Sequence, residues 1–178
     1  MRGRASAALP RVGMLTHFTR RERVASALDK LELILREGVI RSSPRMVRGA
    51  REVVCMFDVP IAELRGLLDH KNRRRYEPFG VAIEKRYAFR MGARPVIYMP
   101  WREAERMLAP EEAWRVVNLE LDRAAPIDWS FEHEWRLAGD LRLPGRGVVA
   151  LVENWRDAEE IYDRFQGDPP CAGVIPLR

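Results

Sequence analysis

Short apolar runs that alternate with amphipathic segments constrain the fold of this 178-residue chain more than any other feature. Each run is rich in β-branched and aromatic residues and is short enough for a buried strand. Five of these runs are EVVCMF at 52–57, VAIEK at 81–85, PVIYM at 95–99, VVALVEN at 148–154 and AGVIPL at 172–177. Together with MLTHFTR at 14–20 and SFEHEWRL at 130–137, they predict about seven strands.

The segments between these runs predict about four or five helices. The clearest is 22–38, whose apolar stripe consists of Val24, Leu28, Leu31 and Leu35. Gly38 stands where a C-terminal cap belongs. The other helices are expected at 61–68 with Asp58 as the N-terminal cap, at 86–92, at 101–125 with a break near Pro110, and at 156–165.

Strands and helices interleave unevenly along the chain, and no internal repeat is present, which indicates an α+β fold. We expect a single domain over 13–178, with a mixed or antiparallel sheet system and helices packed on it. Residues 1–12 are basic and rich in small side chains, so a flexible lead-in is expected there.

Composition excludes several classes of protein. No apolar run approaches the roughly 18–20 residues of a membrane helix, so no membrane span is expected. The two cysteines, Cys55 and Cys171, are too few and too far apart for a zinc site. The three histidines are scattered along the chain, so no metal is expected. Nothing in the cysteine usage suggests an oxidising compartment, and we therefore expect the cytoplasm.

The sequence lacks the glycine-rich phosphate loops, the GxSxG elbow and the HExxH motif, so candidate sites rest on three local features. The first is LTHFTR at 15–20, where His17 and Thr19 stand at the end of a strand and before a helix. A polar side chain at such a position can point into a cleft. The alternative is a core histidine that bonds a backbone carbonyl.

The second feature is the basic loop HKNRRRYEPFG at 70–80. Arg73, Arg74 and Arg75 can contact phosphates, and the ring of Tyr76 can stack on a base. This reading predicts nucleic acid as a partner, whereas the alternative is a solvated loop. The net charge of +5 does not decide between them, because an arginine bias also arises from genome composition.

The third feature is FEHEWR at 131–136. Read as a strand, it places Glu132, Glu134 and Arg136 on one face. The two carboxylates repel each other and Arg136 partly offsets this, so the trio can hold a ligand hydroxyl or a developing cation. The alternative is an exposed sheet face with a cross-strand ion pair, worth less than about 1 kcal/mol.

Taken in order, these features resemble the AbiGi-type abortive-infection family. The resemblance covers residues 15–177 and includes LTHFTR, VVCMFDVPIAEL, RYEPFGVAIEK and WSFEHEWRL. Proteins of this family are described as antitoxin-side members of phage-defence gene pairs. The resemblance therefore implies a phage-resistance component, with a cognate toxin as its partner.

The early H-F-T, the helix that ends in ILREGVI and the late glutamate-bearing strand are also similar to the layout of ADP-ribosyltransferase folds. This resemblance implies that NAD is the substrate and that His17 and Thr19 hold it. It also implies that Glu134 is the catalytic acid, which stabilises the ribosyl cation, and that Glu132 faces the target nucleophile.

Two positions leave the transferase assignment open. In the transferase layout a Ser or Tyr side chain supports the nicotinamide end of NAD. Here that residue is Tyr76, Ser42 or Ser43, and the sequence does not choose among them. Arg136 is not part of the transferase pattern and can pair with Glu134 and quench it. The sequence is thus compatible with an NAD-binding transferase and with a non-catalytic antitoxin or regulator that binds a toxin or nucleic acid.

Overall fold

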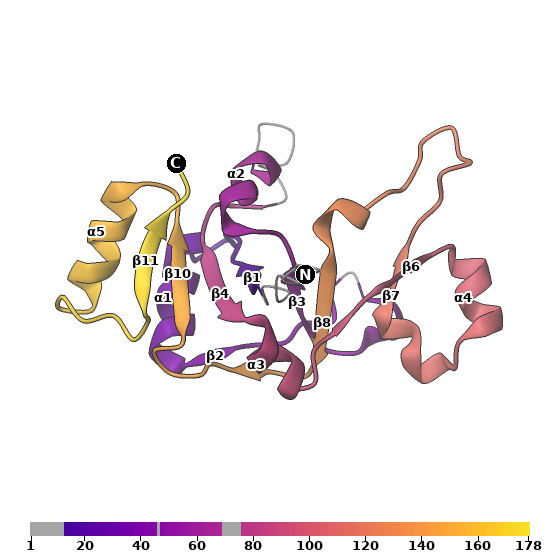
Figure 1. Ribbon diagram of the computed structural model, residues 1–178, viewed down its shortest axis with the longest axis horizontal. Coiled ribbons are helices and arrows are strands. Elements are labelled where there is room, and N and C mark those ends of the chain that lie inside the picture. The colour runs from indigo at the N-terminus through magenta and orange to yellow at the C-terminus, as the bar shows by residue number, and fades with distance from the viewer. Residues whose placement is uncertain (1–12, 46, 69–75) are drawn as a thin grey trace, which may run out of the picture.

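A seven-stranded mixed sheet forms the centre of the computed structural model, which describes residues 13–45, 47–68 and 76–178 (Figure 1). Its strands are β1 (Met14–Phe18), β3 (Val53–Phe57), β4 (Gly80–Glu84), β5 (Arg94–Pro95), β8 (Glu134–Ala138), β10 (Val148–Val152) and β11 (Gly173–Pro176). Their order across the sheet is β11-β10-β4-β1-β3-β8-β5. β10 and β11 are parallel, and the other neighbours are antiparallel.

Two small sheets and five α-helices are described around this central sheet. β2 (Val39–Ile40) pairs with β9 (Leu141–Arg142), and β6 (Ile97–Met99) pairs in parallel with β7 (Val116–Asn118). The helices are α1 (Ala27–Glu37), α2 (Leu64–Leu67), α3 (Lys85–Arg90), α4 (Trp101–Met107) and α5 (Trp155–Arg164). The 3₁₀ segments are η1 (Arg48–Ala50), η2 (Ile61–Glu63), η3 (Pro110–Arg115) and η4 (Ser130–Glu132). This arrangement confirms the predicted α+β fold.

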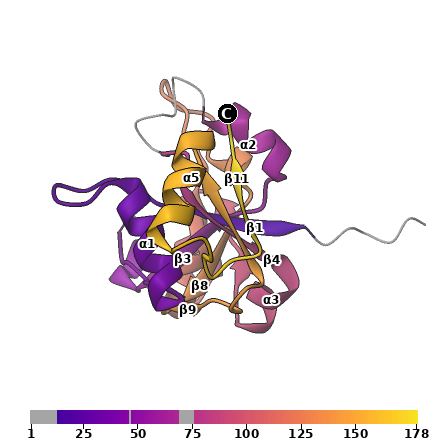
Figure 2. The same cartoon turned by 90° about the vertical axis from the view of Figure 1, so that its left-hand side faces the viewer.

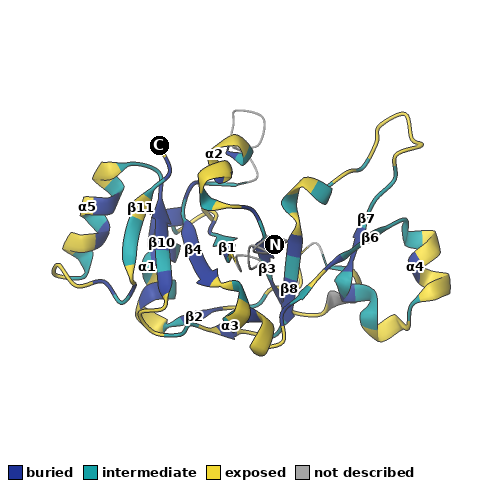
Figure 3. Cartoon of the chain, in the orientation of Figure 1, coloured by how far each residue is buried: buried dark blue, intermediate teal, exposed yellow. Residues whose placement is uncertain are grey.

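Apolar side chains cover both faces of the central sheet. On one face, α1 and α5 pack over the strands, and the buried residues there include Leu15, Leu31, Met56, Ile83 and Ile161. On the other face, the buried cluster includes Phe57, Leu64, Leu68, Ala82 and Leu177. Figure 3 shows how burial varies across the molecule: the central strand β4 is largely buried, whereas most of α4 is exposed. No helix in the described ranges is long and apolar enough to cross a membrane.

The helix predicted over 22–38 begins later than expected. Ser26 caps it, because its Oγ accepts from the Asp29 N–H at 3.0 Å and the Asp29 carboxylate accepts from the Ser26 N–H at 2.9 Å. Gly38 ends the helix in the left-handed conformation, as predicted, with φ of 63°. Val24 lies before the cap and is 96% exposed, so it is not part of the apolar stripe.

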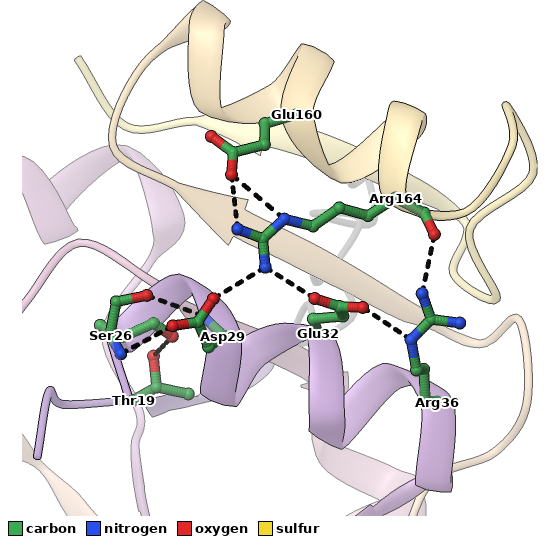
Figure 4. Close-up of polar contacts among 8 residues, drawn as sticks. Thr19, Ser26, Asp29, Glu32, Arg36, Glu160 and Arg164 are labelled. Carbon is green, nitrogen blue, oxygen red and sulfur yellow. Dashed lines mark hydrogen bonds and ion pairs between the residues drawn. The ribbon is translucent and has the colours of Figure 1, made fainter. Parts of the chain in front are cut away.

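Arg164 joins α1 to α5 on the outside of the sheet (Figure 4). Its Nη1 lies 2.9 Å from Asp29 Oδ1 and 2.6 Å from Glu32 Oε2, and its Nη2 lies 2.5 Å from Glu160 Oε1. Arg36 of α1 donates in return to the Arg164 carbonyl at 2.8 Å. Figure 2 shows the two helices side by side at this end of the molecule. We call these contacts the Arg164 clamp.

The helix predicted over 101–125 is wrong beyond Met107. α4 ends there, Pro110 begins η3, and β7 begins at Val116. The single strand predicted over 95–99 is also wrong, because its residues divide between β5 and β6, which belong to different sheets. Residues 97–118 thus form a unit of β6, α4, η3 and β7 beside β8 (Figure 1). We call this unit the wing.

The predicted cap at Asp58 is wrong as well. The 3₁₀ turn before α2 begins at Ile61, and Pro60 occupies its N-cap position. The Asp58 carboxylate instead accepts from the Lys85 ammonium and from the Trp135 indole N–H, the latter at 3.2 Å. Asp58, which follows β3, therefore contacts α3 and β8 rather than capping a helix.

Candidate functional site

The central sheet splits between β1 and β3. β1 pairs with β4 along its whole length. With β3, in contrast, β1 is paired at one position, where Thr16 lies opposite Phe57. A cleft of about 640 Å³ lies at this split, lined by residues of β1, β3 and β8. α1 and β2 contribute one wall of the cleft, and the wing contributes another.

Predicted site residues from distant parts of the chain meet in this cleft. The structure places the following together on its lining: His17, Thr19, Ser43, Tyr76, Glu132, Glu134 and Arg136. The cleft therefore brings His17 of β1 and Glu134 of β8 to one cavity, although the two residues lie far apart in the sequence. Ser42 is directed elsewhere, since its hydroxyl donates to Asp140 Oδ1 at 2.8 Å.

His17 bridges the gap between the two strands that part. Its Nδ1 lies 2.9 Å from the Cys55 carbonyl oxygen of β3. Since a carbonyl only accepts, Nδ1 carries the proton, and Nε2 of the neutral ring is an acceptor. Burial is the largest influence on its pKa, which it lowers, and the nearby Lys30 charge lowers it further. Both readings of His17 hold, because it bonds a backbone carbonyl and also lines the cleft.

Gly80 allows β4 to approach the end of β1 beside this histidine. A Cβ atom at Gly80 would lie 2.2 Å from the backbone carbonyl oxygen of His17. No side chain fits within that distance of a backbone atom, so glycine is required where β4 begins. The close approach fixes the strand end from which His17 reaches the cleft.

Thr19 has a structural role at the start of the α1 wall. Its buried hydroxyl lies 2.8 Å from the Ala27 carbonyl and 3.1 Å from the Phe79 carbonyl. These contacts tie the first residue of α1 to the segment that precedes β4. A contact between Thr19 and a cofactor stays a prediction.

The prediction that SFEHEWRL forms one strand is wrong. Ser130–Glu132 is a 3₁₀ turn, and His133 adopts the left-handed conformation with φ of 44°. The Asp128 carboxylate stabilises the turn by accepting from the Ser130 N–H at 2.8 Å and its hydroxyl at 2.6 Å. Glu132 therefore does not share a strand face with Glu134, although both line the cleft.

Glu132 and Glu134 have different surroundings. Glu132 is half-buried, and its Oε1 accepts from the Tyr76 hydroxyl, whose ring packs edge-on against Phe57 at 5.1 Å between centroids. Glu134 is 6% exposed and forms a fork with Arg136, which is 5% exposed. Arg136 Nε donates to Glu134 Oε1 at 2.7 Å, and Nη2 donates to Oε2 at 3.1 Å.

The same pair attaches the wing to β8. Arg136 Nη1 donates to the carbonyls of Trp114 at 2.5 Å and Val116 at 3.4 Å. The Glu134 N–H donates to the Tyr98 hydroxyl at 2.7 Å, and burial raises the pKa of Tyr98 to about 12. Three residues of the wing thus contact the two residues of the fork. We call these contacts the wing latch.

Cys55 faces the fork from β3, directly opposite Arg136 in the strand register. Burial raises the pKa of its thiol, and the charge of Glu134 raises it further. The thiol therefore stays protonated at neutral pH and is a poor nucleophile. We assign it a packing role at the base of the cleft.

Cations outnumber acids on the cleft lining. The cations are Arg20, Lys30, Arg41, Arg45 and Arg136, and the acids are Glu37, Glu132 and Glu134. Arg20 and Arg45 are exposed, and neither forms an ion pair within the described part of the chain. Lys30 and Arg41 pair with Glu22 and Asp140, which lie outside the lining, so Arg20 and Arg45 are the two cations that favour an anionic ligand.

Two aromatic side chains of the cleft were not anticipated. Trp101 begins α4, and Trp129 precedes η4. Each tryptophan stands at the start of an element, which could have marked it as a candidate. Trp101 was passed over because residues 101–125 were predicted to form one long helix. Among the described residues, no group of three or more His, Cys, Asp or Glu side chains is placed to hold a metal ion.

The sequence predicts a basic patch that contacts nucleic acid in the loop at 70–80. Arg73, Arg74 and Arg75 lie outside the described residues. Contact with nucleic acid through these arginines stays a prediction.

No family model matches the chain. Comparisons with curated proteins and with solved structures also found no match. Any functional assignment therefore rests on the residues of the cleft and on the sequence resemblance described above.

Proposed function

We propose that the cleft binds NAD or a closely related nucleotide. The observation that carries this proposal is the convergence of His17, Tyr76, Glu132 and Glu134 on one cavity of about 640 Å³. Sites for small molecules and cofactors typically enclose roughly 300–1,000 Å³ and combine apolar walls with a few polar groups. The cleft has both properties.

The groups on the lining complement the parts of such a nucleotide. His17 Nε2 is an acceptor for a ribose hydroxyl. Trp101 and Trp129 place aromatic rings on the lining beside a base, and the Arg48 guanidinium lies over the Trp101 ring at 4.7 Å. Arg20 and Arg45 at the lining attract a diphosphate.

The proposed activity is transfer of ADP-ribose within a cytoplasmic phage-defence system. The bond between the ribose C1′ and nicotinamide breaks, and nicotinamide leaves with the bonding electron pair. A carboxylate stabilises the cation at C1′. A nucleophile of the target then bonds to C1′ and loses its proton. The phage-defence role rests on the AbiGi-type resemblance, and the transferase chemistry rests on the ADP-ribosyltransferase-like layout.

A specific observation favours a second candidate, a nucleotide-binding regulator or antitoxin without catalysis. The carboxylate that the layout assigns to catalysis, Glu134, is bound at both oxygens by Arg136. A carboxylate neutralised in this way stabilises a developing cation less well. Release of nicotinamide from NAD by the purified chain separates the two candidates.

Isothermal titration with NAD tests the binding proposal. We expect saturable binding to the wild-type chain. His17→Asn retains a donor for the Cys55 carbonyl but removes the Nε2 acceptor, and it should weaken binding by about tenfold. Glu159→Gln, on the exposed side of α5, is the matched control and should bind as the wild type does. Absence of binding at millimolar NAD would contradict the proposal.

A further inference from the structure

We propose that the wing is a movable wall of the cleft, and that Arg48 and Arg51 are positioning residues that hold this wall where the structure shows it. The wing is the unit of residues 97–118. Four of its residues line the cleft: Trp101, Val116, Val117 and Asn118. Movement of the wing therefore changes the width of the cleft. The inference goes beyond the proposed function, because it holds for any ligand that enters this cleft.

The wing shares neither a strand ladder nor an apolar cluster with the central sheet. Its strands β6 and β7 pair with each other and form a separate two-stranded sheet. Within the part of the chain that the structure describes, four buried apolar residues of the wing belong to neither cluster of the central sheet: Ala104, Trp114, Val116 and Val117. Figure 1 shows the wing at the end of the sheet opposite α5. The apolar core of the central sheet therefore does not extend into the wing.

Arg48 binds the start of the wing from η1, in the segment between β2 and β3. Its guanidinium lies over the Trp101 ring, 4.7 Å from the centroid, and pairs with the Glu105 carboxylate of the same helix, α4. The side chains of this ion pair are exposed, at 41% and 57%. Exposed ion pairs and cation–π contacts are weak individually, so this attachment is readily broken and formed again.

Arg51 binds the next part of the wing, η3, in a similar way. Its guanidinium lies over the Trp114 ring, 5.2 Å from the centroid, and its Nη1 donates to the Glu111 carbonyl at 3.4 Å. The Trp114 carbonyl also accepts from Arg136 of the wing latch, at 2.5 Å. Arginines of two separate segments thus meet at η3, and their polar contacts attach this wall to the rest of the domain.

The chain connections of the wing allow it to move without unfolding the sheet. The chain enters the wing from β5 through Val96 and leaves it after Asn118. Segments that are held by few apolar contacts open locally at a lower free energy than the core of a domain does. The wing can therefore swing on these two connections while the strands of the central sheet stay paired.

Hydrogen exchange followed by mass spectrometry tests this inference on the chain without a ligand. In the wild type, we expect the backbone amides of β6 and β7 to exchange at least tenfold faster than those of β4 and β10. Arg48→Gln/Arg51→Gln should accelerate exchange in β6 and β7 by at least a further factor of about ten and leave β4 and β10 unchanged. Because both arginines act at the surface, Tm should stay within about 3 °C of the wild type.

Two further double variants are the controls. Arg86→Gln/Arg90→Gln removes the same charge from exposed positions of α3 and should exchange as the wild type does. Arg48→Lys/Arg51→Lys retains both cations and should keep exchange in β6 and β7 within about threefold of the wild type. This rescue by the conservative variant identifies the cations, rather than a general loss of stability, as the cause.

Three outcomes would overturn the inference. One is an unchanged exchange rate of β6 and β7 in the glutamine variant of Arg48 and Arg51. The second is equal acceleration in β4 and β10, because the wing would then open only with the whole domain. The third is equal acceleration of β6 and β7 in the α3 control or in the lysine variant.

A final comparison adds NAD and rests on the proposed function. Saturating NAD should slow exchange in β6 and β7 at least tenfold, because a ligand in the cleft contacts the wing wall. Binding by titration without this slowing would contradict the movable wall. Absence of binding would contradict the proposed function alone, since the exchange rates of the chain without a ligand still test the wing.

Discussion

The residues that hold the end of β1 determine whether His17 reaches the cleft. Gly80→Ala places a Cβ 2.2 Å from the His17 carbonyl oxygen, and both groups belong to paired strands. We expect it to lower the free energy of unfolding by more than about 2 kcal/mol, measured by urea denaturation.

Gly173→Ala is the control for this substitution. Gly173 also lies in a strand of the central sheet, and an added Cβ there meets no atom within 4 Å. We expect a change within about 0.5 kcal/mol. Equal effects at the two glycines would mean that the approach of β4 to β1 is not the constraint.

His17 also predicts how stability depends on pH. Its folded-state pKa lies below the ordinary value of 6.5, so the unfolded chain binds this proton more readily than the folded one. The free energy of unfolding should therefore fall as pH decreases from about 6.5 toward the lowered pKa. His17→Asn should remove that part of the slope. The measurement is urea denaturation of both proteins from pH 7.5 to 5, and parallel curves would contradict the prediction.

At this scale, the sequence indicated several residues that line the cleft, but it did not indicate the local backbone that carries them. His17, Tyr76, Glu132 and Glu134 share the cleft, and the pairing of Arg136 with Glu134 was one of the outcomes foreseen. The turn at Ser130–Glu132 was missed because alternation in SFEHEWRL fits a strand. His133 bears no glycine-like signal for its left-handed backbone.

At the scale of elements, the Arg164 clamp supports the wall formed by α1. Lys30 and Leu33 of this helix line the cleft, while Asp29 and Glu32 bind Arg164. Because the clamp is partly exposed, Arg164→Met should lower the free energy of unfolding at pH 7 by only about 1 kcal/mol. Arg146→Met is the matched control, since the Arg146–Asp168 pair is more exposed and should contribute less than about 0.5 kcal/mol.

The stabilisation that the Arg164 clamp contributes depends on pH. The side-chain bond from Arg164, followed by the bonds to Ser26, lowers the Asp29 pKa from 3.8 to about 2. The stabilisation is therefore fully present above about pH 4 and is lost as pH falls toward 2. The stability difference between wild type and Arg164→Met should shrink in that range. A difference that stays constant down to pH 2 would contradict this origin.

The elements that were predicted correctly have local signals. The α1 segment carries a capping serine and a terminal glycine, and the short apolar runs of β3, β4, β10 and β11 are bounded by turn residues. The wing was misread, because VVNLELD continues a helix-like apolar spacing after η3. Only its parallel pairing with β6 makes Val116–Asn118 a strand, and that contact is not local.

At the scale of the whole molecule, the sheet joins two groups of strands at Thr16 and Phe57. A ligand that lies between His17 of β1 and the cleft residues of β3 and β8 should bind the folded chain only. At 100 times its Kd, NAD should therefore raise the free energy of unfolding by about 2.7 kcal/mol, which corresponds to a Tm increase of roughly 5–10 °C. Differential scanning fluorimetry with increasing NAD measures this shift, and a Tm independent of NAD would contradict it.

Strand order was not accessible from the sequence. The apolar runs indicate that strands exist, but they do not determine which run lies beside which. The neighbours β1 and β4 are separated by β3 along the chain, and their contact closes a long loop. The split that creates the cleft depends on this order.

The most direct test of the central claim is a crystal structure of the chain grown with millimolar NAD. We predict ligand density in the cleft between β1 and the wing, with a ribose hydroxyl within hydrogen-bond distance of His17 Nε2. We also predict that the Glu134–Arg136 fork remains intact. An empty cleft, or NAD bound elsewhere on the surface, would contradict the claim that this cleft is a nucleotide site.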